Sequence, residues 1–128
     1  MMNYKVVAKK NPMTKEVKYY AQLAPVTPVR LEALADAISR QCTITIHDVK
    51  AVLSAMQEHI LRTIIDGKSV RLGDLGSFHP TICSEGADQP DNVTAAKIRR
   101  VRVRFRSSVG MKSGLSLTNP SIRFSRIK

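Results

Sequence analysis

The sequence of 128 residues contains no tryptophan, only three phenylalanines, three tyrosines and two cysteines. Because 43% of the residues are apolar, we expect one domain, with or without an extension, around an aliphatic core rather than a disordered chain. No apolar run reaches the roughly 18 residues that could span a membrane, and no signal-peptide stretch is present. Cys42 and Cys83 match no metal-binding spacing, so we expect reduced, packed thiols in a cytoplasmic protein.

Patterns typical of enzymes are also missing. His47, His59 and His79 lack metal-ligand spacing, and no serine or threonine lies in a nucleophile elbow. The segment Gly73-Asp74-Leu75-Gly76 lacks the Lys-Ser/Thr pair and the helix of a phosphate loop, so Asp74 is interpreted as a turn residue. We predict no catalysis, no cofactor, no metal and no small-molecule substrate.

Acidic residues are missing from the last thirty positions, although the whole chain has a net charge of +11. Residues 99–128 contain nine Lys or Arg and no acid, and residues 1–28 contain five Lys and one Glu. Residues 29–98 contain seven basic and nine acidic residues. This asymmetry indicates a polyanionic partner.

Hydrophobic periodicity predicts an α+β fold. Alternation predicts a β-hairpin within residues 1–26. Two helices should follow, the first capped by Thr27 with Pro28 at its first position, the second capped by Thr45 and stopped by Gly67. The predicted elements of the larger domain, residues 27–128, are helices over 27–41 and 45–66, a sheet with an arm over 69–106, a weak helix over 107–117 and a strand over 121–127.

The second predicted helix carries two apolar faces near its C-terminal end. Leu61 and Ile65 lie beside Ile60 and Ile64, whereas a surface helix needs a single apolar stripe. We interpret the second face as a dimer interface.

Residues 98–106 alternate throughout. Val101, Val103 and Phe105 share one side of the predicted strand, and four arginines share the other. Strand faces exposed to solvent usually mix charges, so four arginines on one face favour phosphate binding. The residues predicted to bind DNA are Lys68, Arg71, Arg99, Arg100, Arg102, Arg104, Arg106 and Lys112.

These features carry a family resemblance over about residues 27–117. Two helices, then Asp74-Leu75-Gly76-Ser77-Phe78, an arm-like segment and the strand at 101–106 resemble the bacterial histone-like HU family, which includes integration host factor. The N-terminal hairpin resembles the extension of a variant branch of that family.

The resemblance implies an intertwined homodimer whose helices form a base and whose sheets form a saddle on double-stranded DNA. It implies a histone-like, nucleoid-associated protein that tolerates many sequences and serves DNA architecture and chromosome condensation. Pro90 would be the arm-tip wedge between base steps. The tip reads Asp88-Gln89-Pro90-Asp91-Asn92, where the family usually has Arg-Asn-Pro, so we expect its negative charge to oppose entry into the groove.

Two other functions fit the sequence. The pI near 10.2 also suits an RNA-binding, ribosome-associated protein, which competition between DNA and RNA duplexes would identify. The acidic loop suits a protein-interaction module that has lost DNA bending.

Overall fold

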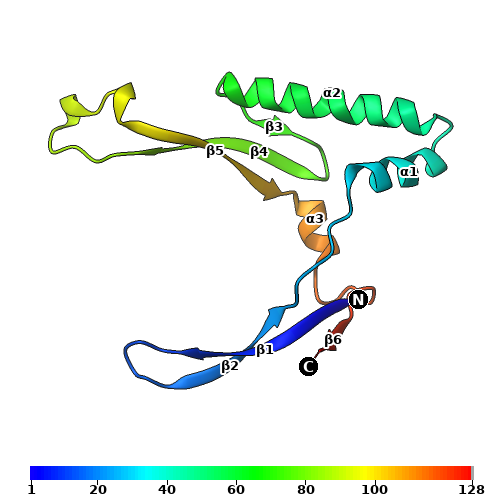
Figure 1. Ribbon diagram of the computed structural model, residues 1–128, viewed down its shortest axis with the longest axis horizontal. Helices are drawn as coiled ribbons and strands as arrows, with labels where there is room; N and C mark the ends of the chain where they lie inside the picture. Colours follow the sequence, from blue (N-terminus) through cyan, green and yellow to red (C-terminus); the bar gives the residue numbers. More distant parts are fainter. Residues whose placement is uncertain (128) are drawn as a thin grey trace. The chain divides into compact units, whose positions relative to one another are not determined.

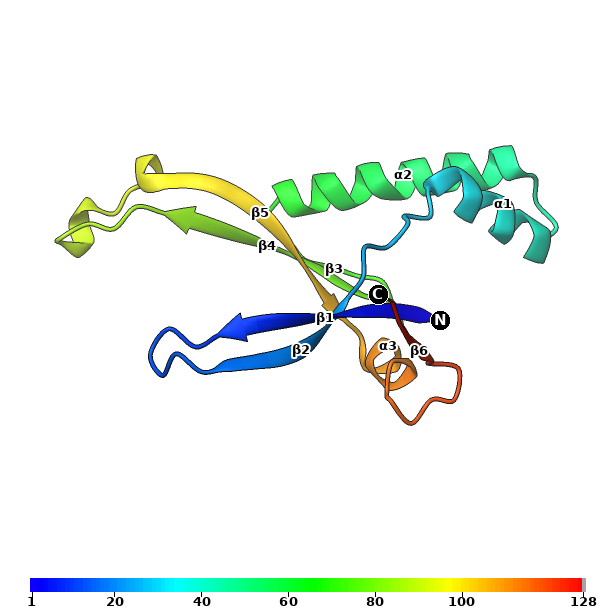
Figure 2. The same ribbon diagram turned by 60° about the horizontal axis from the view of Figure 1, so that its bottom comes forward.

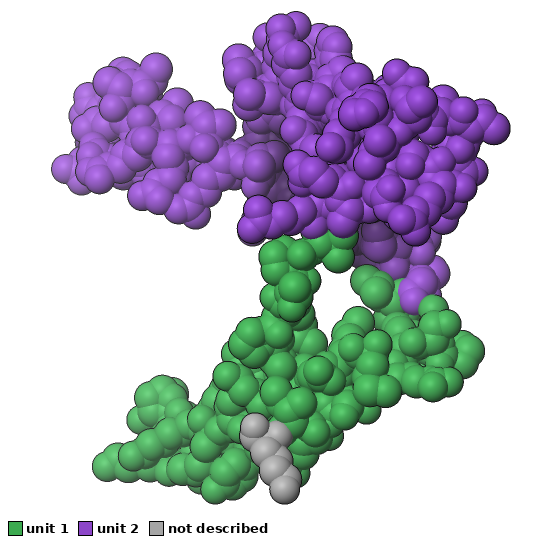
Figure 3. All heavy atoms as spheres, turned by 45° about the vertical axis from the view of Figure 1, so that its right-hand side comes forward, with its two compact units in different colours: residues 1–29, 115–128 green, residues 30–114 purple. Residues whose placement is uncertain are grey.

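The computed structural model describes residues 1–127 and divides into two compact units (Figures 1 and 3). Unit 1 comprises Met1–Val29 with Leu115–Lys128, and unit 2 comprises Arg30–Gly114. Lys128, counted above in the basic C-terminal segment, lies outside the described residues. The expected division at residue 26 therefore differs from the structure, because the C-terminal tail groups with the N-terminal hairpin.

Unit 1 is a three-stranded sheet with strand order β2-β1-β6. Strands β1 (Met2–Lys10) and β2 (Val17–Leu23) pair antiparallel, which confirms the predicted hairpin. Strand β6 (Phe124–Arg126) is shorter than predicted and pairs parallel to the start of β1. The first and last strands of the chain therefore belong to one sheet (Figure 1).

Unit 2 begins with two helices, α1 (Leu31–Gln41) and α2 (Ile46–Ile65). The prediction that Thr27 caps the first helix is wrong: the N-cap is Arg30, without a side-chain cap. Val26 and Val29 are 71% and 77% exposed. They are therefore packed only slightly, and tertiary packing supplies most helical stability in proteins.

Both ends of α2 form as predicted. The Thr45 hydroxyl accepts a hydrogen bond from the Asp48 amide at 3.2 Å. At the other end Gly67 has φ +80° and donates to the Ile64 carbonyl at 2.9 Å, while the Lys68 amide donates to Thr63 at 3.1 Å. This pair of bonds is a Schellman motif, which needs a left-handed residue at Gly67.

The second sheet has strand order β3-β4-β5, all antiparallel. Strand β3 (Val70–Arg71) is short, whereas β4 (Gly76–Ser84) and β5 (Ile98–Ser107) form a long two-stranded ribbon. The ribbon extends beyond the helices in two views and ends in a loop with the short 3-10 helices η1 (Pro90–Asn92) and η2 (Ala95–Lys97) (Figures 1 and 2). We call this ribbon the arm and residues 85–97 the tip loop.

The arm leads into a six-residue helix, α3 (Val109–Gly114), shorter than the predicted 107–117. Ser108 caps it: its hydroxyl accepts from the Met111 amide at 3.0 Å and donates to the Asp74 carbonyl. Thus Ser108 links α3 to the turn between β3 and β4.

The core within one chain is very small. Among residues 1–127 the only buried apolar residues are Ala24, Ala35 and Val49. Cys42 and Cys83 are free and exposed, so the expectation that both are packed thiols is wrong. The chain therefore leaves most of its apolar side chains partly or fully open.

No helix of residues 1–127 combines the length and apolarity that crossing a membrane requires. In the same range, no group of three or more His, Cys, Asp or Glu could hold a metal ion.

Candidate nucleic-acid interface

The arm carries a row of arginines along one face of β5, which we call the arginine ladder. Its members occupy alternate positions of the strand: Arg100, Arg102, Arg104 and Arg106. Alternate residues of a strand point to the same face, and antiparallel pairing adds the facing residues of β4 to that face. These residues are Cys83, Thr81, His79 and Ser77, in the same order as their arginine partners.

The opposite face of the arm is apolar. Phe105, Val103 and Val101 of β5 pair with Phe78, Pro80 and Ile82 of β4. The rings of Phe78 and Phe105 lie with centroids 5.1 Å apart at an interplanar angle of 52°, a favourable tilted contact. This aromatic pair helps to set the register between β4 and β5, and that register determines on which face of the arm the arginines lie.

The arginine ladder is exposed and carries uncompensated positive charge. All four side chains belong to exposed residues, and in the described part of the chain none of them forms an ion pair. Alternate strand residues lie about 6.5–7 Å apart, so neighbouring guanidiniums repel one another. An anionic partner would relieve that repulsion.

The short strand β3 widens the basic face at the base of the arm. Arg71 pairs with Ser77 of β4, and Ser77 pairs with Arg106 of β5, so the three residues form one row across the sheet. The Ser77 hydroxyl lies 2.7 Å from His79 Nε2. A pocket of about 170 Å³ opens here, lined by Arg71, Gly73, Gly76, Ser77, Arg106, Ser107 and Ser108. Two guanidiniums and the hydroxyls of Ser77 and Ser107 suit it to one phosphate group.

Gly76 makes the base of the arm possible. It is buried with φ +150°, and a Cβ there would lie 2.4 Å from the Arg106 carbonyl oxygen and 2.7 Å from Cζ of Phe105. Only glycine permits this close approach of β4 to β5.

Arg99 lies apart from the arginine ladder. The arm register shifts between Cys83 and Ser84, so that Cys83 pairs with Arg100 and Ser84 with Ile98. Arg99 forms a salt bridge with Glu85, whose carboxylate also lies 3.9 Å from Lys97 Nζ. The structure therefore places Arg99 in an ion pair at the base of the tip loop.

The other predicted contacts are dispersed. Lys68 lies exposed in the turn after α2, and Lys112 lies exposed in the last turn of α3. Pro90 is the first residue of η1 and is exposed in the tip loop. Asp88 and Asp91 flank it, and within residues 1–127 neither forms an ion pair.

The four residues of the predicted dimer interface differ in exposure. Ile60 and Ile64 are half-buried, whereas Leu61 is 61% and Ile65 72% exposed. In this single chain, the second apolar face of α2 is therefore uncovered.

The β4 residues on the basic face were not among the predicted contacts. His79 and Thr81 lie opposite Arg104 and Arg102, and the Thr81 hydroxyl donates to the Arg102 carbonyl at 3.5 Å. The signal was present, since β4 also alternates polar and apolar residues from Ser77 to Ile82.

Comparisons with known proteins give a family match and two structural neighbours. Residues 1–121 match the family described as HU domain fused to wHTH, Ig, or glycine-rich motif. A crystal structure of a candidate bacterial DNA-binding protein from Bacteroides vulgatus is similar with TM-score 0.68 and 13% identity, over 98% of this chain and 48% of that one. This chain thus spans about half the length of that relative.

The HU protein of Anabaena, solved in a cocrystal with DNA, is similar with TM-score 0.55 and 19% identity. The match covers 70% of this chain and 99% of that one. No curated protein matches the sequence. The neighbours establish an HU-like α+β fold.

Proposed function

Since the chain belongs to the family of HU domains fused to a winged helix-turn-helix, Ig or glycine-rich motif, we propose that it is a non-enzymatic DNA-binding protein. It holds double-stranded DNA by the phosphate backbone and serves DNA architecture in the nucleoid. The observation that carries the proposal is the arginine ladder: four exposed, unpaired guanidiniums on one face of an extended arm.

Backbone binding follows from the geometry of the ladder. Its spacing of about 6.5–7 Å is on the scale of successive phosphates along one DNA strand. Arginine matches phosphate oxygens with two parallel N–H donors. Contacts to phosphates carry no direct sequence information, so this face is suited to sequence-tolerant binding.

The working form in the proposal is a homodimer. The apolar face of the arm is open, with Ile82 and Val101 each 63% exposed and Val103 54% exposed. Leu61 and Ile65 of α2 add to this uncovered surface. The chain has 43% apolar residues, but only three of them are buried within residues 1–127, so it lacks the core that its composition could form. A second copy, which presents the same apolar surfaces, would complete it.

The tip loop limits how the arm meets DNA. Pro90 of the tip loop is the candidate wedge between base steps, but phosphates would repel Asp88 and Asp91 beside it. We therefore assign DNA holding to the ladder and the base of the arm, and we assign the tip acids the role of opposing deep groove insertion.

The test is the salt dependence of duplex binding by the variant Arg102→Gln/Arg104→Gln. Each phosphate contact contributes about 0.9 to the slope of log affinity against log salt. A dimer loses about four contacts, so the slope should fall by roughly 3–4 units, with a similar loss for unrelated sequences. Val101, Val103 and Phe105 are untouched, so the variant should fold.

Three results would overturn the proposal. A folded variant with the wild-type slope would move the binding surface away from the ladder. Preference for a matched RNA duplex in competition would instead assign the ladder to RNA. A loss confined to one sequence would show that these arginines read bases rather than phosphates.

A further inference from the structure

The positive charge of unit 1 is almost unopposed. Unit 1, the smaller of the two, holds eight of the 21 Lys and Arg residues but only one of the ten acids, Glu16. Unit 2 holds thirteen basic and nine acidic residues. Unit 1 therefore has the larger excess of basic over acidic residues, although the arginine ladder belongs to unit 2.

Three lysines of unit 1 share one face of the hairpin. The register of β1 and β2 pairs Lys9 with Lys18. Two residues further along it pairs Val7 with Tyr20, and four residues further along it pairs Lys5 with Gln22. Alternate residues share a face, so Lys5, Lys9 and Lys18 lie together with Tyr20. We call this set the hairpin lysine face.

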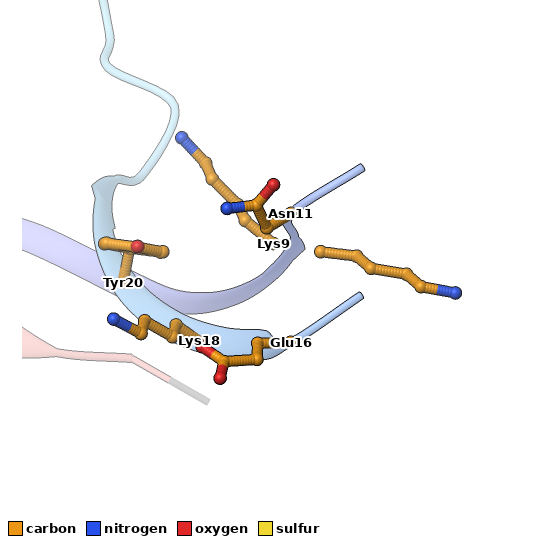
Figure 4. Close-up of a pocket in the computed structure, with 6 residues that line it drawn as sticks. Lys9, Asn11, Glu16, Lys18 and Tyr20 are labelled. Atoms are coloured by element: carbon orange, nitrogen blue, oxygen red, sulfur yellow. The ribbon is translucent and has the colours of Figure 1, made fainter. Parts of the chain in front are cut away.

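The arrangement near the turn is open and built around Tyr20. Lys9 Nζ lies 5.6 Å from the centroid of the Tyr20 ring, a cation–π contact. Figure 4 shows the side chains of Lys9 and Lys18 on the same side of the hairpin as Tyr20. They line a pocket of about 440 Å³ together with Lys10, Asn11 and Glu16.

The lysines of this face are not needed to build the hairpin. Its turn is closed by backbone bonds from Asn11 to Glu16 at 2.9 Å and from Lys15 to Asn11 at 2.8 Å. The Asn11 side chain also accepts from the Met13 amide at 2.9 Å. Like charges directly opposite on paired strands destabilise a sheet, so the Lys9–Lys18 pair costs stability in the free protein. In residues 1–127 neither lysine has an ion-pair partner.

We propose that the hairpin lysine face is a second contact for the DNA backbone, separate from the arginine ladder. The inference rests on the proposed function, because it takes the same duplex as partner. Phosphates would neutralise the Lys9–Lys18 repulsion, and lysine binds phosphate as a point charge without fixed geometry. Two contacts on one chain raise the overall affinity because the second binds at a high effective concentration.

The experiment compares full-length variants by duplex affinity against salt. Lys9→Gln/Lys18→Gln removes two contacts per chain, so the slope should fall by about 1.8 per chain. The control Arg40→Gln/Arg62→Gln removes the same charge from two helix-surface residues that form ion pairs with Asp36 and Glu58. The control should keep a slope close to that of the wild type. Thermal unfolding checks that the lysine variant remains folded.

The ladder variant Arg102→Gln/Arg104→Gln makes the outcomes separable. Loss of slope in both the ladder and the lysine variants supports both surfaces. Loss only in the ladder variant overturns the inference and leaves the proposed function standing. Loss only in the lysine variant supports the hairpin and overturns the ladder as the DNA surface.

Two further results would also overturn the inference. One is a control variant that loses as much slope as the lysine variant, which would mean that net charge alone matters. The other is a lysine variant that keeps the duplex slope but loses affinity for single-stranded DNA, RNA or an acidic protein.

Discussion

Leu61→Asp is expected to separate the proposed homodimer into monomers. Leu61 and Ile65 are 61% and 72% exposed in the single chain. Full burial of a Leu or Ile side chain stabilises by about 1.5–3 kcal/mol, so covering the exposed remainder of each contributes about 1–2 kcal/mol. A symmetric dimer counts every such contact twice. The two side chains together should therefore contribute about 4–8 kcal/mol to association.

The substitution removes the Leu61 share from both chains, about 2–4 kcal/mol. Because each 1.4 kcal/mol is tenfold in affinity, the dissociation constant should rise by about 30- to 1,000-fold. The buried aspartate adds a desolvation cost of several kcal/mol. At micromolar protein the variant should therefore sediment as a monomer.

The assay is sedimentation velocity over a concentration series, with Ala55→Asp as the matched control. Ala55 is exposed on the same helix, and it shares a face with Glu58 and Arg62, three and seven positions further on. That face carries the Glu58–Arg62 ion pair, so the control adds the same charge away from the apolar surface. A wild-type protein that sediments as a monomer at micromolar concentration would refute the reasoning. Equal dissociation constants for the two aspartate variants would also refute it.

Two further perturbations test the arm. Gly76→Ala should lower the free energy of unfolding by more than about 3 kcal/mol, because it combines a strained φ with a Cβ 2.4 Å from a carbonyl oxygen. The control is Gly86→Ala, where an added Cβ would have nothing within 4 Å. Equal urea midpoints for the two variants would contradict the prediction. Asp88→Asn/Asp91→Asn should tighten duplex binding several-fold at low salt, with the gain lost at high salt. Unchanged low-salt affinity would mean that the tip loop lies away from DNA.

Local patterns were sufficient to predict most of the elements. The hairpin, the Thr45 cap, the stop at Gly67 and the alternation of β5 each depend on neighbours in sequence, and all of them formed as predicted. The HU-like fold was predicted from the family resemblance of the segment Asp74-Leu75-Gly76-Ser77-Phe78, and the structure shows that Gly76 allows a close approach of β4 to β5.

The misses depend on contacts distant in sequence. The pairing of β6 with β1 joins residues 2–4 to residues 124–126, and no periodicity encodes which strand a short tail will choose. The first helix begins at Leu31 rather than near Pro28 because the residues before it are packed only slightly. Arg99 was predicted to bind DNA, whereas it forms an ion pair with Glu85, fourteen residues away in sequence, and no local pattern encodes that pairing.

The shift in register between Cys83 and Ser84 determines where the ladder ends. Successive residues of β5 point to opposite faces of the arm, so the arginines occupy one face and Val101, Val103 and Phe105 occupy the other. A register slip of one residue would exchange the two faces. The Phe78–Phe105 pair and the close approach at Gly76 hold the register at the base of the arm. Beyond Cys83 the register is free to shift, and there Arg99 pairs with Glu85. The arm is therefore able to present uncompensated charge along β5 from Arg100 to Arg106, while Glu85 compensates the basic residues next to the tip loop.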